Sequence, residues 1–210
     1  MNLTDRYSHE VFNDLDGPVQ ANNLLRDIPD AIHQLGEVIR KHGLENDLRI
    51  RLLHKHYSLD RDEIVVAKIE ENQILIRPRK QKDCAARPTA WMFHKSEWRP
   101  FEFMEEADGG SVLAEQTERI KQAPGFLREF SQKAQDMNLA NVLGIALLLS
   151  GVIAMPTGYV WHENTDEASR TSTVELADKG IRGPNIIDTY WAFSGGILVS
   201  EGSCGHKPGP

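Results

Sequence analysis

Hydrophobic and polar positions alternate with a period of two along residues 48–57, and this pattern predicts a β-strand. The apolar residues at even positions share one face, which His54 and His56 continue toward the core. Arg49 and Arg51 at odd positions predict an opposite face that meets solvent. Because a strand rises about 3.3 Å per residue, the two imidazoles are about 6.5–7 Å apart along it. They can therefore converge on a metal ion or a small ligand.

Further short runs of alternating or β-branched residues predict strands in two groups. They comprise residues 63–69, 73–77, 89–94, 99–104, 158–163, 170–176 and 188–193. The short connections within each group are typical of antiparallel meanders. Apolar residues repeat at helical spacing in residues 18–42, 112–121 and 124–137, with a break at Pro29 in the first segment. Strand groups on either side of a helical block argue against a regular βαβ alternation.

The longest uncharged stretch runs from residue 137 to residue 162, and residues 139–155 within it are mostly apolar. These 17 residues are at the short limit for a membrane span, and no Lys/Arg cluster flanks them. A helix that is apolar all round must be buried. We therefore predict a buried apolar helix near residues 139–149 and no membrane partner.

The predicted elements combine into one α+β domain over residues 1–210. Its fold class is a twisted antiparallel sheet with helices packed on one face and with the buried apolar helix near residues 139–149. Residues 1–16 show no firm period and predict a loosely attached N-terminal arm. The Gly-rich residues 195–210 predict a flexible C-terminal tail.

Composition narrows the class of protein. A hydrophobic fraction of 40% with 26% charged residues is ordinary for a soluble globular chain. The net charge of −7 argues against nucleic acid as a partner, because no excess of Lys and Arg replaces phosphate counterions. The N-terminus lacks the apolar core of a signal peptide, and two cysteines, Cys84 and Cys204, are too few for a disulfide scaffold. These features favour a cytoplasmic location.

Metal ligation is the first candidate chemistry. His54 and His56 are candidate ligands for a divalent transition metal such as zinc, which takes imidazole, thiolate and carboxylate donors. Candidates for the remaining ligands are His94, His162, Glu163, Cys204 and His206. Histidine pairs on strands occur in many proteins without metal, so a structural role and a pocket that holds no metal are the alternatives.

Carboxylate chemistry is the second candidate. Glu163 alternates with Tyr159 and Trp161 on a predicted strand, so the three share a face. If that face is inward, the pKa of the buried Glu163 carboxyl is raised and the group can act as a general acid or base. Pairing with Arg170 across a hairpin is the structural alternative. His54, His56 and Glu163 are accordingly the candidate catalytic residues.

Other chemistries find little support. The chain has no Gly-X-Ser-X-Gly elbow, no phosphate-binding loop and no dinucleotide fingerprint. The sequence therefore favours a small-molecule-binding protein, with enzymatic activity undecided, whose pocket is lined by core-facing histidines that are also candidate metal ligands. The alternative is a non-catalytic interaction module whose acidic surface contacts a protein partner or a second copy of the chain.

Overall fold

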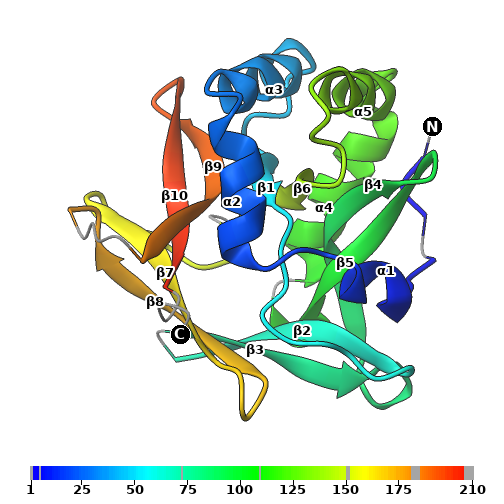
Figure 1. The fold of residues 1–210 in the computed structure, drawn as a ribbon, viewed down its shortest axis with the longest axis vertical. Coiled ribbons are helices and arrows are strands. Elements are labelled where there is room, and N and C mark those ends of the chain that lie inside the picture. Colours follow the sequence, from blue (N-terminus) through cyan, green and yellow to red (C-terminus); the bar gives the residue numbers. More distant parts are fainter. Residues whose placement is uncertain are drawn as a thin grey trace.

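The computed structural model describes residues 2–4, 6–71, 73–108, 110–149, 152–180 and 185–205. Ten strands of this part form one closed barrel in the order β1-β6-β4-β5-β2-β3-β8-β7-β10-β9 (Figure 1). Pairing of β9 with β1 closes the ring. The predicted α+β fold, a twisted antiparallel sheet with helices packed on one face, is therefore wrong. Closure pairs the two edges that an open sheet would leave with unsatisfied backbone groups.

The strands are short, and most neighbouring strands are antiparallel. Their bounds are β1 Leu48–Leu52, β2 Glu63–Glu70, β3 Gln73–Lys80, β4 Ala86–His94, β5 Glu97–Glu105, β6 Leu143–Leu147, β7 Tyr159–Asp166, β8 Thr171–Asp178, β9 Ile186–Ser194 and β10 Ile197–Gly205. Four hairpins supply much of the wall, namely β2–β3, β4–β5, β7–β8 and β9–β10. Two parallel contacts, β2 with β5 and β7 with β10, join the hairpins to one another.

The helices lie outside the barrel, and three of them gather near β1 and β6 (Figure 1). The helices are α1 His9–Asn13, α2 Pro18–Arg26, α3 Ala31–Lys41, α4 Gly110–Gln122 and α5 Phe126–Asp136, with short 3₁₀ turns η1 Gln81–Asp83 and η2 Glu106–Asp108. Helix α3 contacts α5 and β1, α2 contacts β1 and β9, and α4 contacts β6. The helical layer thus covers one side of the wall.

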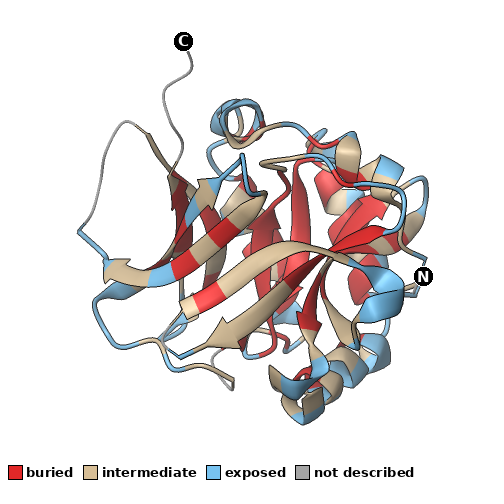
Figure 2. Ribbon diagram, turned by 90° about the horizontal axis from the view of Figure 1, so that it is seen from below, coloured by how far each residue is buried: buried red, intermediate tan, exposed pale blue. Residues whose placement is uncertain are grey.

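This one-sided cover explains how burial is distributed (Figure 2). Every residue of β1 and β6 is buried, because one face meets the barrel interior and the other meets the helices. In β7, by contrast, Trp161 and Glu163 are buried while their neighbours are partly or fully exposed. The outer face of the β7–β8 hairpin meets solvent, as the alternation of buried and exposed residues along β7 indicates.

The apolar segment is buried as predicted, but the predicted helix near residues 139–149 is wrong. Residues Leu143–Leu147 form strand β6, in which Ile145 is paired with Ile50 on one side and with Trp91 on the other. A short apolar run bounded by turns suits a strand covered on both faces as well as a buried helix, so periodicity does not separate the two. In the described part of the chain, no helix is both long enough and apolar enough to span a membrane.

Described residues near both ends of the chain pack against the barrel. Helix α1 lies within the predicted N-terminal arm, and Phe12 and Leu15 are buried against the barrel cluster that contains Phe101. The first half of the predicted tail is β10, whose backbone pairs with β9 and with β7. Residues 206–210 lie outside the described residues.

A glycine in β6 tests this packing. A Cβ atom added at Gly144 would lie 2.5 Å from the backbone oxygen of Trp91. Rotation of a side chain cannot relieve this clash, because the oxygen belongs to the backbone. We expect Gly144→Ala to lower the free energy of unfolding by about 1–3 kcal/mol, measured by urea unfolding, because the strands must shift. Gly110→Ala is the matched control, since an added Cβ there meets no heavy atom within 4 Å. Equal stability of the two variants would contradict the register of β4 and β6.

Candidate metal centre

The inner face of the barrel is defined by a cavity of about 40 Å³. Its lining comes from residues on β1, β2, β3, β4, β5, β7, β8 and β9, so it lies inside the ring. Arg49 lines this cavity, and Arg51 lines a second one of about 20 Å³. The two arginines are 8% and 2% exposed, so the predicted solvated face of β1 is wrong. Leu48, Ile50 and Leu52 face the opposite way, toward the layer that contains α2 and α3.

The histidines follow the end of β1, where the chain leaves the wall. The Leu53 N–H donates to the Val142 carbonyl at 2.8 Å, and the Lys55 N–H donates to the Asp16 carbonyl at 3.0 Å. The period-two alternation ends with the strand, and His54 turns inward to line the smaller cavity beside Arg51. Its burial is confirmed at 3% exposure, and the His56 side chain is 10% exposed. The predicted shared face with Ile50 and Leu52 is wrong.

The two imidazoles contact each other. Because a carbonyl oxygen only accepts hydrogen bonds, His54 Nδ1 donates to the Leu52 oxygen at 2.9 Å. This bond assigns the proton to Nδ1 and leaves a lone pair on Nε2. His54 Nε2 lies 3.2 Å from His56 Nε2, and the rings are nearly perpendicular at 87°. The lone pair of His54 is thus aimed at the space that it shares with His56.

Two further groups reach this space from the opposite end of the chain. Strands β7 and β10 are parallel, and their register pairs Glu163 with Cys204, so both side chains point inward. The candidate donor atoms of His54, His56 and Cys204 all lie within 4.8 Å of one another. Glu163 Oε1 lies 3.3 Å from His56 Nε2. The structure therefore brings together all three residues that the sequence nominated as catalytic, and it adds a thiol.

Charged groups surround the cluster. Arg51 Nη2 donates to Glu102 Oε1 at 2.5 Å and lies 4.0 Å from Glu163 Oε2. The Tyr190 hydroxyl donates to Glu102 Oε2 at 3.4 Å. The guanidinium carbons of Arg49 and Arg51 lie 3.8 and 4.0 Å from the centroid of the Tyr190 ring, which is cation–π distance. The barrel interior therefore contains a network of charged and polar side chains with apolar residues around it.

Burial and this network set the protonation states. Burial, aided by the charges of Arg51 and His56, lowers the pKa of His54 to about 3, so the ring is neutral at physiological pH. Burial alone would raise the pKa of Glu163, but the hydrogen bond from His56 and the charges of His56 and Arg51 hold it well below its usual range. The raised pKa expected for a buried Glu163 is therefore wrong. Burial raises the pKa of the Cys204 thiol to about 12.

The donor set fits a borderline transition metal. Zinc–nitrogen bonds of about 2.0–2.1 Å at tetrahedral angles place two nitrogen ligands about 3.3 Å apart. The observed separation of 3.2 Å between the two Nε2 atoms matches this edge. The bond from His54 Nδ1 to the Leu52 carbonyl is the kind of outer contact that orients a ligating imidazole. A bound cation would also lower the pKa of the nearby thiol and favour its ligating form.

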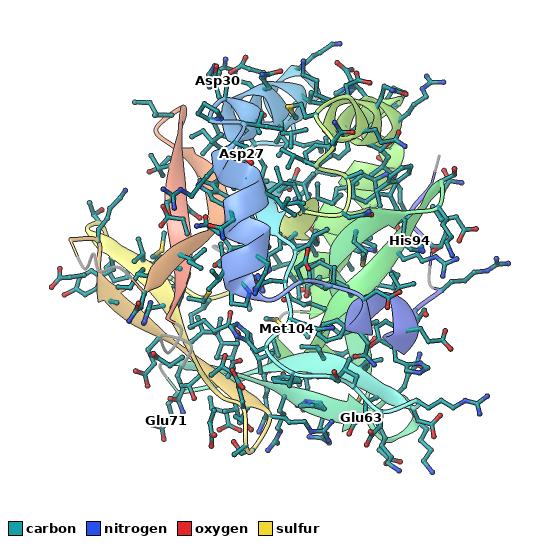
Figure 3. The ribbon with its side chains drawn as sticks, in the orientation of Figure 1. Asp27, Asp30, Glu63, Glu71, His94 and Met104 are labelled. Carbon is teal, nitrogen blue, oxygen red and sulfur yellow. The ribbon has the colours of Figure 1, made fainter. Side chains whose placement is uncertain are left out.

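The other nominated residues lie elsewhere. His162 is on the outer face of β7, where its Nδ1 lies 3.0 Å from Ser203 Oγ. His94, labelled in Figure 3, lies at the end of β4 and does not line either interior cavity. Arg170 donates to Glu63, labelled in the same figure, at 2.7 and 2.9 Å rather than pairing with Glu163. His206 lies outside the described residues.

Sequence reasoning missed the charged partners of the site. Arg49 and Arg51 were assigned to solvent, and neither Glu102 nor Tyr190 was nominated. A signal for the arginines was present, since two charges alternate with leucine and isoleucine in a short strand. That pattern has the same form whether the charged face meets water or a polar barrel interior. Glu102 and Tyr190 carry no comparable local signal.

Comparisons with known proteins assign no relative. No family model, no curated protein and no solved structure matches the chain. The functional argument therefore rests on the geometry of the site.

The neutral buried His54 predicts a pH dependence of stability. Its pKa falls from 6.5 to about 3 on folding, so the unfolded chain binds this proton more readily. The contribution of His54 is complete above its unfolded pKa and is lost as the pH falls from there toward the folded value. We expect this group to lower the free energy of unfolding by up to about 1.4 kcal/mol per pH unit between about pH 6 and pH 4.

Urea unfolding at several pH values measures this slope. His54→Gln should lack this part of the pH dependence, while His33→Gln should retain it, because the His33 side chain is 73% exposed. An unchanged slope in His54→Gln would show that His54 is not held neutral.

Proposed function

We propose that the protein binds one divalent transition-metal ion inside the barrel through His54, His56 and Cys204. The observation that carries this proposal is the convergence of two nitrogens and one sulfur within 4.8 Å, in a buried position, from opposite ends of the chain. Two imidazole nitrogens and a thiol sulfur this close together are the types of donor that a borderline transition metal binds. A metal ion satisfies all three together.

The types of donor narrow the choice of metal. Two imidazoles and one thiolate suit zinc and other borderline or soft cations, whereas magnesium and calcium take oxygen ligands. Three protein ligands are also the number typical of a site that keeps one coordination position open. Zinc is the best fit to this donor set, and cobalt(II) is its usual spectroscopic substitute.

Glu163 supports the site from beside His56. Its low pKa keeps it ionised, so it supplies negative charge where a dication would bind. Its Oε1 lies 3.3 Å from His56 Nε2, the nitrogen proposed as a ligand, so the carboxylate would lie beside a bound ion and balance its charge. When bound, such a metal supplies Lewis-acid chemistry. The proposed roles are therefore ligands for His54 and His56 and a charge-balancing carboxylate for Glu163.

The dimensions of the interior limit the accompanying ligand. The cavities of about 40 and 20 Å³ are far below the size of pockets that hold drug-sized ligands. A cavity needs at least about 10–15 Å³ to hold one water molecule, so these two cavities suit a ligand of a few heavy atoms. The small-molecule function suggested by the sequence is therefore proposed in a narrower form, as a metal with at most a very small co-ligand.

Cobalt(II) titration tests the metal site directly. We expect one cobalt ion per chain, with the intense visible bands of four-coordination and a near-ultraviolet band from the thiolate. His54→Ala should weaken binding by more than the roughly 10- to 100-fold that loss of an outer partner produces, and Glu163→Gln should fall in that 10- to 100-fold range. Cys204→Ser should remove the thiolate band.

The matched control is His162→Ala, which removes an imidazole from the outer face of the same strand that carries Glu163. It should bind cobalt as the unsubstituted protein does. Absence of stoichiometric cobalt or zinc binding, with folding verified by circular dichroism, would refute the proposal. Equal binding by His54→Ala and His162→Ala would place the metal elsewhere.

A further inference from the structure

The second buried arginine of β1 differs from the first in its partners. Arg51 pairs with Glu102, but Arg49 has no carboxylate within ion-pair distance among the described residues. Its Nε is buried without a hydrogen-bond partner, and its guanidinium lies over the face of the Tyr190 ring. A buried cation without an anion is strongly unfavourable, whereas arginine binds a carboxylate through parallel hydrogen bonds. Among the described residues, Arg49 therefore has no carboxylate directly beside it.

The nearby acidic groups do not supply such a partner. Glu102 already accepts hydrogen bonds on both oxygens, one from Arg51 and one from Tyr190. Glu201 attracts the Arg49 guanidinium electrostatically, but its carboxylate is not within ion-pair distance of it. The guanidinium faces the cavity of about 40 Å³, which has room for roughly three water-sized groups.

The cavity walls indicate what kind of anion fits. Most of the lining is apolar and includes Val65, Ile74 and Val174, and Arg49 is the charged donor on it. The Thr89 hydroxyl already donates to the backbone carbonyl of Glu102 at 3.4 Å. Such a space suits an anion with one charged end and a short apolar end. Phosphate and sulfate are larger, carry more charge and require more donors than this cavity offers.

We propose that Arg49 anchors the carboxylate of a short monocarboxylic acid, of about the size of acetate, in the barrel interior. The methyl end would pack among the apolar walls, and the carboxylate would complete the charge pairing that Arg49 lacks. This site shares Val65, Ile76 and Glu102 with the lining of the metal-site cavity, but it does not depend on a metal. Its test is therefore run with a chelator present.

Saturation-transfer NMR with acetate as the probe measures binding to the full-length protein. Acetate should bind, while acetamide, which has nearly the same shape but no charge, should bind at least about tenfold more weakly, since a hydrogen bond to a charged group is worth about that factor or more. Arg49→Met should weaken acetate binding by a similar factor, and Arg49→Lys should retain part of it. Arg99→Met is the control, because Arg99 pairs with Glu97 and does not line the cavity.

A second variant keeps the test decisive if Arg49→Met fails to fold. Ala67 lines the cavity, so Ala67→Leu should fill it and abolish acetate binding while Arg49 stays in place. No binding of acetate to the unsubstituted protein would overturn the proposal. Equal binding of acetate and acetamide, full displacement of acetate by equimolar chloride, or unchanged acetate binding in Ala67→Leu would also overturn it. Failure of cobalt binding would leave this result unaffected.

Discussion

The guanidinium of Arg51 is the contact on which the barrel interior depends. It donates to Glu102 on β5, lies 4.0 Å from Glu163 on β7 and is held over the ring of Tyr190 on β9. Its charge helps to keep His54 neutral and Glu163 ionised. Loss of one partner from a buried ion pair typically costs about 3–5 kcal/mol, because the other charge is left unpaired. One side chain on β1 therefore contacts three other strands of the barrel, and together with burial and His56 it contributes to the protonation states of the candidate metal centre.

The same polar interior explains why a small barrel can hold a thiol and two imidazoles at its centre. Closure of the ring by β1 and β9 turns the charged face of β1 inward, and the helices cover the opposite face. The parallel pairing of β7 with β10 then places Glu163 and Cys204 side by side on the inner wall. Each of these placements comes from a pairing between distant segments, so the site exists only when the barrel is closed.

Part of this arrangement was predictable. The strand over residues 48–52 follows from hydrophobic periodicity, and the burial of residues 143–147 follows from their apolar character. His54 is buried as predicted, but on the other face from Ile50 and Leu52. Of the residues that the sequence offers as further ligands beside the histidine pair, Glu163 lies 3.3 Å from His56, whereas His162 lies on the outer face of β7. The α+β sheet and the buried helix were wrong, because a period of two does not reveal how many strands follow one another around a ring. A five-residue apolar run likewise does not distinguish a strand from a helix.

The sequence by itself determined that the apolar runs are buried and which residues can carry chemistry, because the burial of apolar residues follows from hydrophobicity and ligand capacity follows from the donor atoms. It nominated His54, His56, Glu163 and Cys204 without placing them at one point. Only the tertiary structure decided which face of β1 is inside, since an arginine on a strand meets water or a polar interior according to what covers the other face. It also decided the pKa of Glu163, because burial raises that pKa while His56 and Arg51, brought close by folding, lower it further.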